Sequence, residues 1–133
     1  MPASSYVATS TLNAWLRGTP PASFPSNVYV GLFLTNPGPS GTGTEVTGGG
    51  YSRAPAVFGA PTSASGLTAI VTNSSPVTFP QASSSWGTPQ YFALYDSLTG
   101  GNMLFYGTIP APYEVLPGMT PQYGTGVLRT SAV

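Results

Sequence analysis

The sequence predicts an all-β protein with one short helix at its N-terminus. Three observations predict this class: short apolar runs recur along the chain, many of the 17 glycines and 15 prolines fall between them, and one stretch with helical periodicity precedes them all. Turn residues between short apolar runs are typical of a β-sandwich or barrel. We therefore expect a single β-sandwich or jelly-roll-like domain over residues 1–133, with a helix at about residues 5–17 and strands within residues 28–130.

Residues 5–17 have the pattern of an amphipathic helix. A serine precedes the segment as a candidate N-cap, and Gly18, followed by two prolines, ends it. Arg17 lies in the last turn, where its charge complements the helix dipole. The apolar stripe consists of Ala8, Leu12, Trp15 and Leu16. This position in the stripe predicts that Trp15 packs in the core or at an interface rather than against a small ligand.

From residue 28 the apolar period changes from 3.6 to 2. Residues 28–34 are apolar or aromatic at nearly every position, so we expect this strand to be covered on both faces. Residues 35–50 contain several glycines and are predicted to form a flexible loop outside the core. Residues 51–58 are predicted to form a second strand, with Pro55 at a sheet edge or a bulge because proline lacks an amide donor.

The strongest hairpin signal joins residues 90–95 to residues 102–109 through a Gly-rich turn. By simple alternation, Met103, Phe105 and Ile109 are expected on one face of the second strand. Further short strands are expected elsewhere, at residues 67–72, 77–79, 113–116 and 126–129.

The composition excludes several classes of function. Only 5% of residues are charged, against roughly 25% in an ordinary soluble protein. With net charge zero and no lysine, the chain cannot form a basic groove, which argues against binding nucleic acid through its phosphates. No apolar stretch approaches the roughly 20 residues of a membrane-spanning helix. Without cysteine there is no disulfide, thiolate nucleophile or Cys-based metal site.

The low charge also suggests what covers the surface. A chain that is 41% hydrophobic and 12% aromatic is not typical of disorder. Soluble monomers usually keep their net charge away from zero, so a neutral surface is expected to be covered in part by neighbouring subunits. The alternative is that Ser, Thr and Gly solvate this surface unaided.

Candidates for catalysis are few. Without histidine a Ser–His–Asp triad cannot form. The three carboxylates, Glu45, Asp96 and Glu114, fall in or beside predicted turns, where they are expected to be solvated or to act as caps. We predict no catalytic, metal-binding or cofactor-binding residues. The alternative is a glycan-acting enzyme that uses Asp96 with Glu114.

Two further features point to packing. A Glu45–Arg53 pair is expected to pin the Gly-rich loop, and Arg53 would act as an anchor if it were buried at a subunit contact. The eight tyrosines and two tryptophans suit buried contacts and interfaces. Sugar stacking at Trp86 is the weaker alternative, because few hydrogen-bonding side chains lie near it in the sequence.

An ordered set of short phrases resembles a family of small structural proteins of tailed bacteriophages, whose members are known as tail-fibre-like proteins and whose relatives resemble capsid cement (decoration) proteins. The resemblance runs from about residue 12 to residue 109 and is weaker after Pro110. The phrases are Tyr29-Val30-Gly31-Leu32-Phe33, Thr35-Asn36-Pro37-Gly38, Glu45-Val46-Thr47-Gly48-Gly49-Gly50-Tyr51-Ser52-Arg53, Thr72-Asn73-Ser74, Val77-Thr78-Phe79-Pro80, Ser85-Trp86-Gly87-Thr88, Ala93-Leu94-Tyr95-Asp96 and Gly100-Gly101-Asn102-Met103-Leu104-Phe105-Tyr106-Gly107.

The resemblance implies a virion protein that is oligomeric and has no catalytic residues. Because the chain has no heptads or shaft-like repeat, we expect a capsid cement protein on the outer capsid surface, bound to the major capsid protein and to copies of itself, as a trimer. The alternative is a tail or tail-fibre module that binds a host glycan or another tail protein. Neither hypothesis involves nucleic acid or a membrane. The residues expected at protein contacts are Trp15, Arg17, Tyr51, Arg53, Tyr113 and Tyr123.

Overall fold

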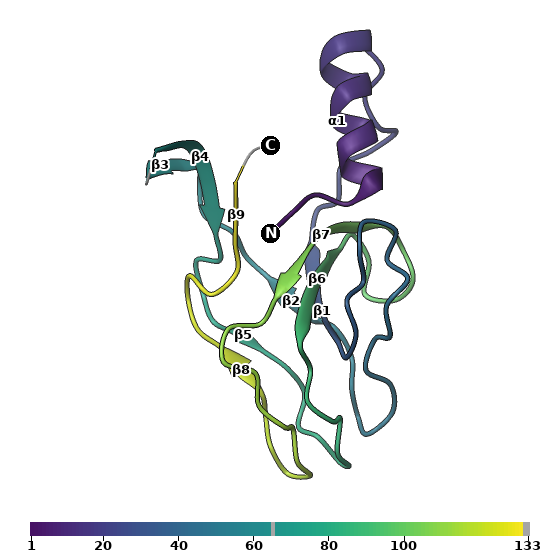
Figure 1. Cartoon of the computed structure of the whole chain (residues 1–133), viewed down its shortest axis with the longest axis vertical. Coiled ribbons are helices and arrows are strands. Elements are labelled where there is room, and N and C mark those ends of the chain that lie inside the picture. The colour runs from purple at the N-terminus through teal and green to yellow at the C-terminus, as the bar shows by residue number, and fades with distance from the viewer. Residues whose placement is uncertain (65, 132–133) are drawn as a thin grey trace.

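The structure, a computed structural model, describes residues 1–64 and 66–131 and confirms the all-β class with one short helix (Figure 1). In the described part, antiparallel strands form three sheets. The first sheet has the order β2 (Ala54–Ala56), β1 (Val28–Phe33), β6 (Tyr91–Tyr95) and β7 (Met103–Thr108). The second is β3 (Thr62–Ala64), β4 (Leu67–Thr72) and β9 (Arg129–Ser131), and the third is β5 (Val77–Thr78) and β8 (Gln122–Tyr123).

The main core lies on one face of the first sheet. Val30 and Leu32 of β1 and Phe92 and Leu94 of β6 alternate onto this face, and each is at most 3% exposed. Ala54 of β2 also belongs to this core, and the third sheet and the loops supply the rest, namely Val46, Val77, Phe79, Ala82, Trp86, Ile109, Val115, Tyr123 and Leu128. The period of 2 in the sequence thus places the predicted apolar side chains inside.

The other face of the first sheet is also covered, as predicted for β1. Phe33, Ala93, Tyr95 and Met103 form a second, smaller apolar cluster there. The prediction that residues 35–50 form a loop outside the core is wrong. Val46 is only 2% exposed and donates its amide to Leu32. The segment follows the sheet because its backbone bonds to β1, which satisfies polar groups that a free loop would leave to water.

The β6–β7 hairpin is confirmed, but one detail of its faces is wrong. Leu94 pairs with Phe105 and Tyr95 pairs with Met103, so β7 carries one extra residue at this point. This bulge reverses the alternation. Met103 therefore packs with Tyr95 on the outer face, whereas Phe105 contacts the main core.

The remaining strands follow the sequence in part. β4 has the predicted bounds, and Pro55 lies in β2 at an edge of the first sheet, as expected. The predicted strand at residues 51–58 is shortened to β2, and the strands predicted at 113–116 and 126–129 are replaced by β8 and β9. In the first of these two segments, Val115 makes only an isolated bridge with Gly87. The sequence pattern did not indicate β3.

Helix α1 (Ser5–Arg17) has the predicted bounds and caps. Ser4 accepts a hydrogen bond from the amide of Val7, and Gly18 ends the helix in the left-handed conformation at φ 67°. Among the thirteen residues of α1, all of which the structure describes, none is buried. The prediction of packing in the core or at an interface is therefore wrong for the core, because the helix projects from the sheets (Figure 1), while packing at an interface stays a prediction. In the described residues, no helix is long and apolar enough to cross a membrane.

Candidate functional site

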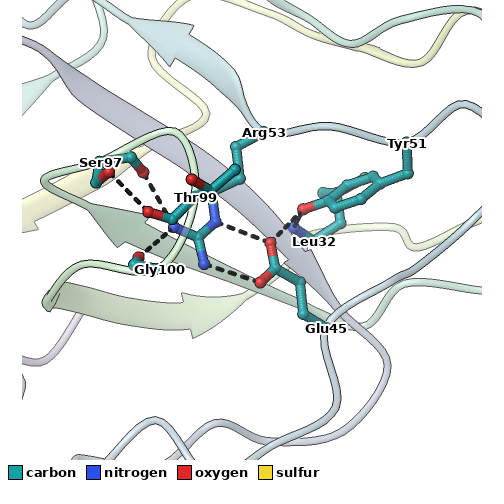
Figure 2. Close-up of polar contacts among 7 residues, drawn as sticks. All are labelled: Leu32, Glu45, Tyr51, Arg53, Ser97, Thr99 and Gly100. Carbon is teal, nitrogen blue, oxygen red and sulfur yellow. Dashed lines mark hydrogen bonds and ion pairs between the residues drawn. The ribbon is translucent and has the colours of Figure 1, made fainter.

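Two features of the molecule are candidates for function, and the first is a buried polar cluster on the outer face of the first sheet (Figure 2). Glu45 and Arg53 form a two-pronged ion pair, in which Nε donates to Oε2 and Nη2 donates to Oε1, both at 2.9 Å. The predicted Glu45–Arg53 pair is thereby confirmed. Glu45 is only partly exposed, at 22%, so the expectation that it is solvated is wrong.

Tyr51 completes this cluster. Its hydroxyl donates to Oε2 of Glu45 at 2.7 Å and accepts from the amide of Leu32 at 2.9 Å. Gly31 makes room for both groups, because a Cβ at that position would lie 2.9 Å from Oε2 of Glu45 and 3.4 Å from the hydroxyl of Tyr51. The glycine in the middle of β1 thus has a packing reason.

Arg53 connects the cluster to the β6–β7 turn. Its Nη1 donates to the backbone carbonyls of Ser97 at 3.0 Å and Gly100 at 2.7 Å (Figure 2). Together with the pair to Glu45, these bonds use four N–H groups of the guanidinium. The side chain therefore joins the segment around Glu45 to the β6–β7 turn, which is far away in the sequence, and this is a structural role.

The electrostatics agree with this role. Burial raises the pKa of the Tyr51 hydroxyl, and its hydrogen bond to Glu45 raises it further. Burial alone lowers the pKa of Arg53, but the bonded carboxylate of Glu45 outweighs that effect and the pKa ends above its ordinary value. Both groups stay in one protonation state at neutral pH, so neither Tyr51 nor Arg53 offers a general acid or base there.

A second set of aromatic side chains lies inside the molecule. The Tyr123 ring makes edge contacts with Phe79 at 5.9 Å and Phe92 at 4.9 Å, and it stacks on Tyr113 at 6.1 Å. Trp86 is 3% exposed and donates its Nε1 to the carbonyl of Gly49 at 2.9 Å. The packing interpretation of Trp86 is confirmed, since a buried ring cannot stack on a sugar.

The structure does not bring the candidate catalytic carboxylates together. Asp96 follows the last residue of β6 and accepts bonds from the backbone and side chain of Asn102, so it closes the hairpin turn. Glu114 precedes Val115, which forms an isolated bridge with Gly87. Gly87 lies before the first residue of β6, so Glu114 is near the opposite end of this strand from Asp96. Five residues of strand span roughly 16 Å, which exceeds the roughly 5–10 Å between the carboxylates of a glycosidase. Among the residues described, no group of three or more potential metal ligands is found.

The second candidate feature is an exposed apolar surface at the projecting end of α1. Leu12 is 59% exposed, Trp15 83%, Leu16 77% and Phe24 76%. Leu12, Trp15 and Leu16 share one helix face, and Phe24 lies in the segment that returns alongside α1 (Figure 1), where it borders a common cleft with Trp15. We call these four residues the apolar tip.

The expected contact residues thus fall into two groups. Trp15 and Arg17 are exposed on α1, whereas Arg53 and Tyr123 are buried and Tyr51 and Tyr113 are partly buried within the chain. A role for any of them between subunits stays a prediction. Phe24 was missed, because a single phenylalanine between prolines carries no periodicity.

Comparison with known proteins shows the family to which this chain belongs. In the described residues, the fold is a β-rich module of three antiparallel sheets with one projecting helix. Residues 2–131 match the family described as podophage GP4 fiber I protein gp80. The chain belongs to this family and is a structural protein of the phage virion. No curated protein matches the chain.

Proposed function

We propose that this protein is a non-enzymatic subunit of a phage fibre and that the apolar tip of α1 is its attachment surface to other virion proteins. The observation that carries the proposal is the exposure of Leu12, Trp15 and Leu16 on a helix that buries none of its residues, together with the exposure of Phe24 in the segment that follows. The family description, which names a fibre protein, supports the fibre over the capsid.

The exposure of this apolar surface to water is energetically unfavourable. Taking roughly 150–250 Å² for a large apolar side chain, the apolar tip exposes on the order of 600 Å², the upper end of the largest patches on soluble monomers. A helix of thirteen residues is also marginal on its own in water. A partner that covers the tip removes the apolar surface from water and stabilises the helix at the same time.

Two measurements on purified phage particles test this proposal. Quantitative gel analysis gives the copy number, and immunogold labelling with an antibody against the β-sheet body gives the location. We expect few copies per particle, with gold at the fibres. Hundreds of copies spread over the head would instead support capsid decoration and contact with the major capsid protein, and would overturn the fibre assignment.

A further inference from the structure

We propose that the apolar tip of one copy inserts into an apolar groove on a second copy of the same chain. This inference deepens the proposed function and rests on it for its biological setting. The structure holds both halves of the contact on different parts of one molecule, so each copy could receive one neighbour and enter another.

The groove lies between the first and second sheets and has a volume of about 410 Å³. Its walls come from two sides, with Leu94, Leu104 and Phe105 on the first sheet and Ala69 and Val71 on β4. The volume falls within the range of roughly 300–1,000 Å³ that accepts drug-sized ligands. An indole ring together with one leucine side chain is smaller than such a ligand, so the volume of the groove is sufficient for them.

The occupant has to be apolar and uncharged. No described residue that lines the groove carries a charge, and Arg17 is the only charged side chain among residues 1–44. A charged partner would be desolvated in the groove without a counter-ion, which is costly. Charge repulsion between copies is also minimal, because the net charge is zero.

The area of the apolar tip also favours a second copy of the chain as the occupant of the groove. A standard interface buries about 800 Å² on each partner. The apolar tip supplies most of this area, and the groove supplies a concave apolar surface for it. Contact of a tip with another tip would leave the groove unfilled and would match two convex surfaces, which gives poor shape complementarity.

A tip-to-groove contact has a specific geometric consequence. It joins two different patches and is therefore heterologous, so repetition yields a ring or an open filament rather than a closed two-fold dimer. Such growth is suitable for a subunit of an extended structure.

Sedimentation velocity on the purified full chain over a range of concentrations tests the inference. We expect the mass of the wild-type protein to rise above that of the monomer as concentration increases. Trp15→Ser with Leu16→Ser removes the tip, and Ala69→Glu places a charge in the groove. Each variant is expected to weaken association by at least about tenfold. The matched control is Leu98→Ser with Leu116→Ser, which removes two exposed leucines elsewhere and should associate like the wild type.

Mixing the two defective variants is the decisive step. The tip variant keeps an intact groove and the groove variant keeps an intact tip, so a heterologous contact predicts a 1:1 heterodimer that grows no further. Association of Ala69→Glu alone at wild-type strength would show that tips pair with tips and would overturn the proposal. So would a wild-type chain that stays monomeric at every concentration.

Controls keep these outcomes interpretable. Circular dichroism establishes that each variant is folded, and if Ala69→Glu unfolds, Ser131→Glu places the same charge in the groove from β9, the strand that pairs with β4. The location of the protein on the particle is measured separately. A monomeric chain found at the fibres would refute this inference alone, whereas a self-associating chain found on the head would refute only the fibre assignment.

Discussion

The guanidinium of Arg53 lies over the ring of Tyr95, with its central carbon 3.6 Å from the centroid of the ring. The same group is bonded in its plane to Glu45 and to the turn carbonyls of Ser97 and Gly100. A planar cation is needed for both the stacking and the bonds in the plane. Lysine carries three donors on one nitrogen and no planar group, so it cannot contact the ring face and make all of these bonds at once, and the site favours arginine.

Replacing Arg53 by alanine is expected to lower the free energy of unfolding by about 3 kcal/mol or more, because it leaves the carboxylate of Glu45 without its partner. Arg53→Lys should recover little of this loss. Arg129→Ala, at an exposed position, is the control and should stay within about 0.5 kcal/mol of wild type. Urea denaturation measures all three, and an Arg53→Ala protein as stable as the control would contradict the structural role of the cluster.

Two adjacent glycines separate backbone strain from packing. Gly48 and Gly49 both have positive φ, at 73° and 60°, so alanine is strained at either position. A Cβ on Gly48 meets open space, whereas one on Gly49 would lie 2.9 Å from Nε1 of Trp86 and 2.6 Å from Oγ of Ser84. We expect Gly49→Ala to lose about 1–3 kcal/mol more than Gly48→Ala. Thermal unfolding of the two variants measures the stability that each one loses. Equal losses would contradict the close approach of Trp86 to Gly49.

Alkaline pH should destabilise the protein through its buried tyrosines. Burial raises the pKa of Tyr123, with a smaller contribution from Tyr113, so the folded state disfavours ionisation. This contribution to stability is complete below the unfolded-state pKa of about 10 and is lost as pH rises above it. We expect denaturation midpoints to fall above about pH 10.

Two matched variants test which tyrosine causes the loss of stability at alkaline pH. Tyr123→Phe keeps the ring contacts but cannot ionise, so its stability should fall less steeply above about pH 10, by up to about 1.4 kcal/mol per pH unit. Tyr6→Phe changes an exposed ring and should leave the slope unchanged. Identical slopes for all three proteins would show that Tyr123 ionises freely in the folded state.

Asn73 is fully buried and has all its partners inside the chain. Its Nδ2 donates to the carbonyls of Ser75 and Gly124, and its Oδ1 accepts from the amide of Leu128. Asn73→Ala strands these groups, each at a cost of about 1–3 kcal/mol, so we expect at least about 2 kcal/mol of lost stability. Asn27→Ala, at an exposed position, serves as the control. Denaturation curves that coincide for the two variants would refute this role.

Local signals predicted much of the fold. The helix could be predicted because Gly18 and the apolar spacing lie within one short segment, and the β6–β7 hairpin because both strands flank one turn. Met103 was assigned to the wrong face because a bulge depends on how two strands align and leaves no mark in alternation. β3, β8 and β9 are two or three residues long, too short for a period to be seen.

The candidate site, like the fold, could be predicted from the sequence only in part. The Glu45–Arg53 pair could be predicted because the two charges are close in a nearly uncharged sequence. The burial of Val46 could not, since a Gly-rich loop gives no indication of what it covers. The exposure of Trp15 was equally hidden, because an apolar stripe predicts a covered face without indicating whether the same chain covers it.

The exposed position of Arg17 offers a way to test whether the projecting helix is covered. Trypsin cuts after arginine and lysine, and the chain offers only Arg17, Arg53 and Arg129. Arg53 is held inside, while Arg17 is exposed at the last residue of α1, next to Gly18. Brief digestion is therefore expected to cut the chain after Arg17 and after the exposed Arg129, and protection of the Arg17–Gly18 bond alone on intact particles would report that the end of the helix is covered.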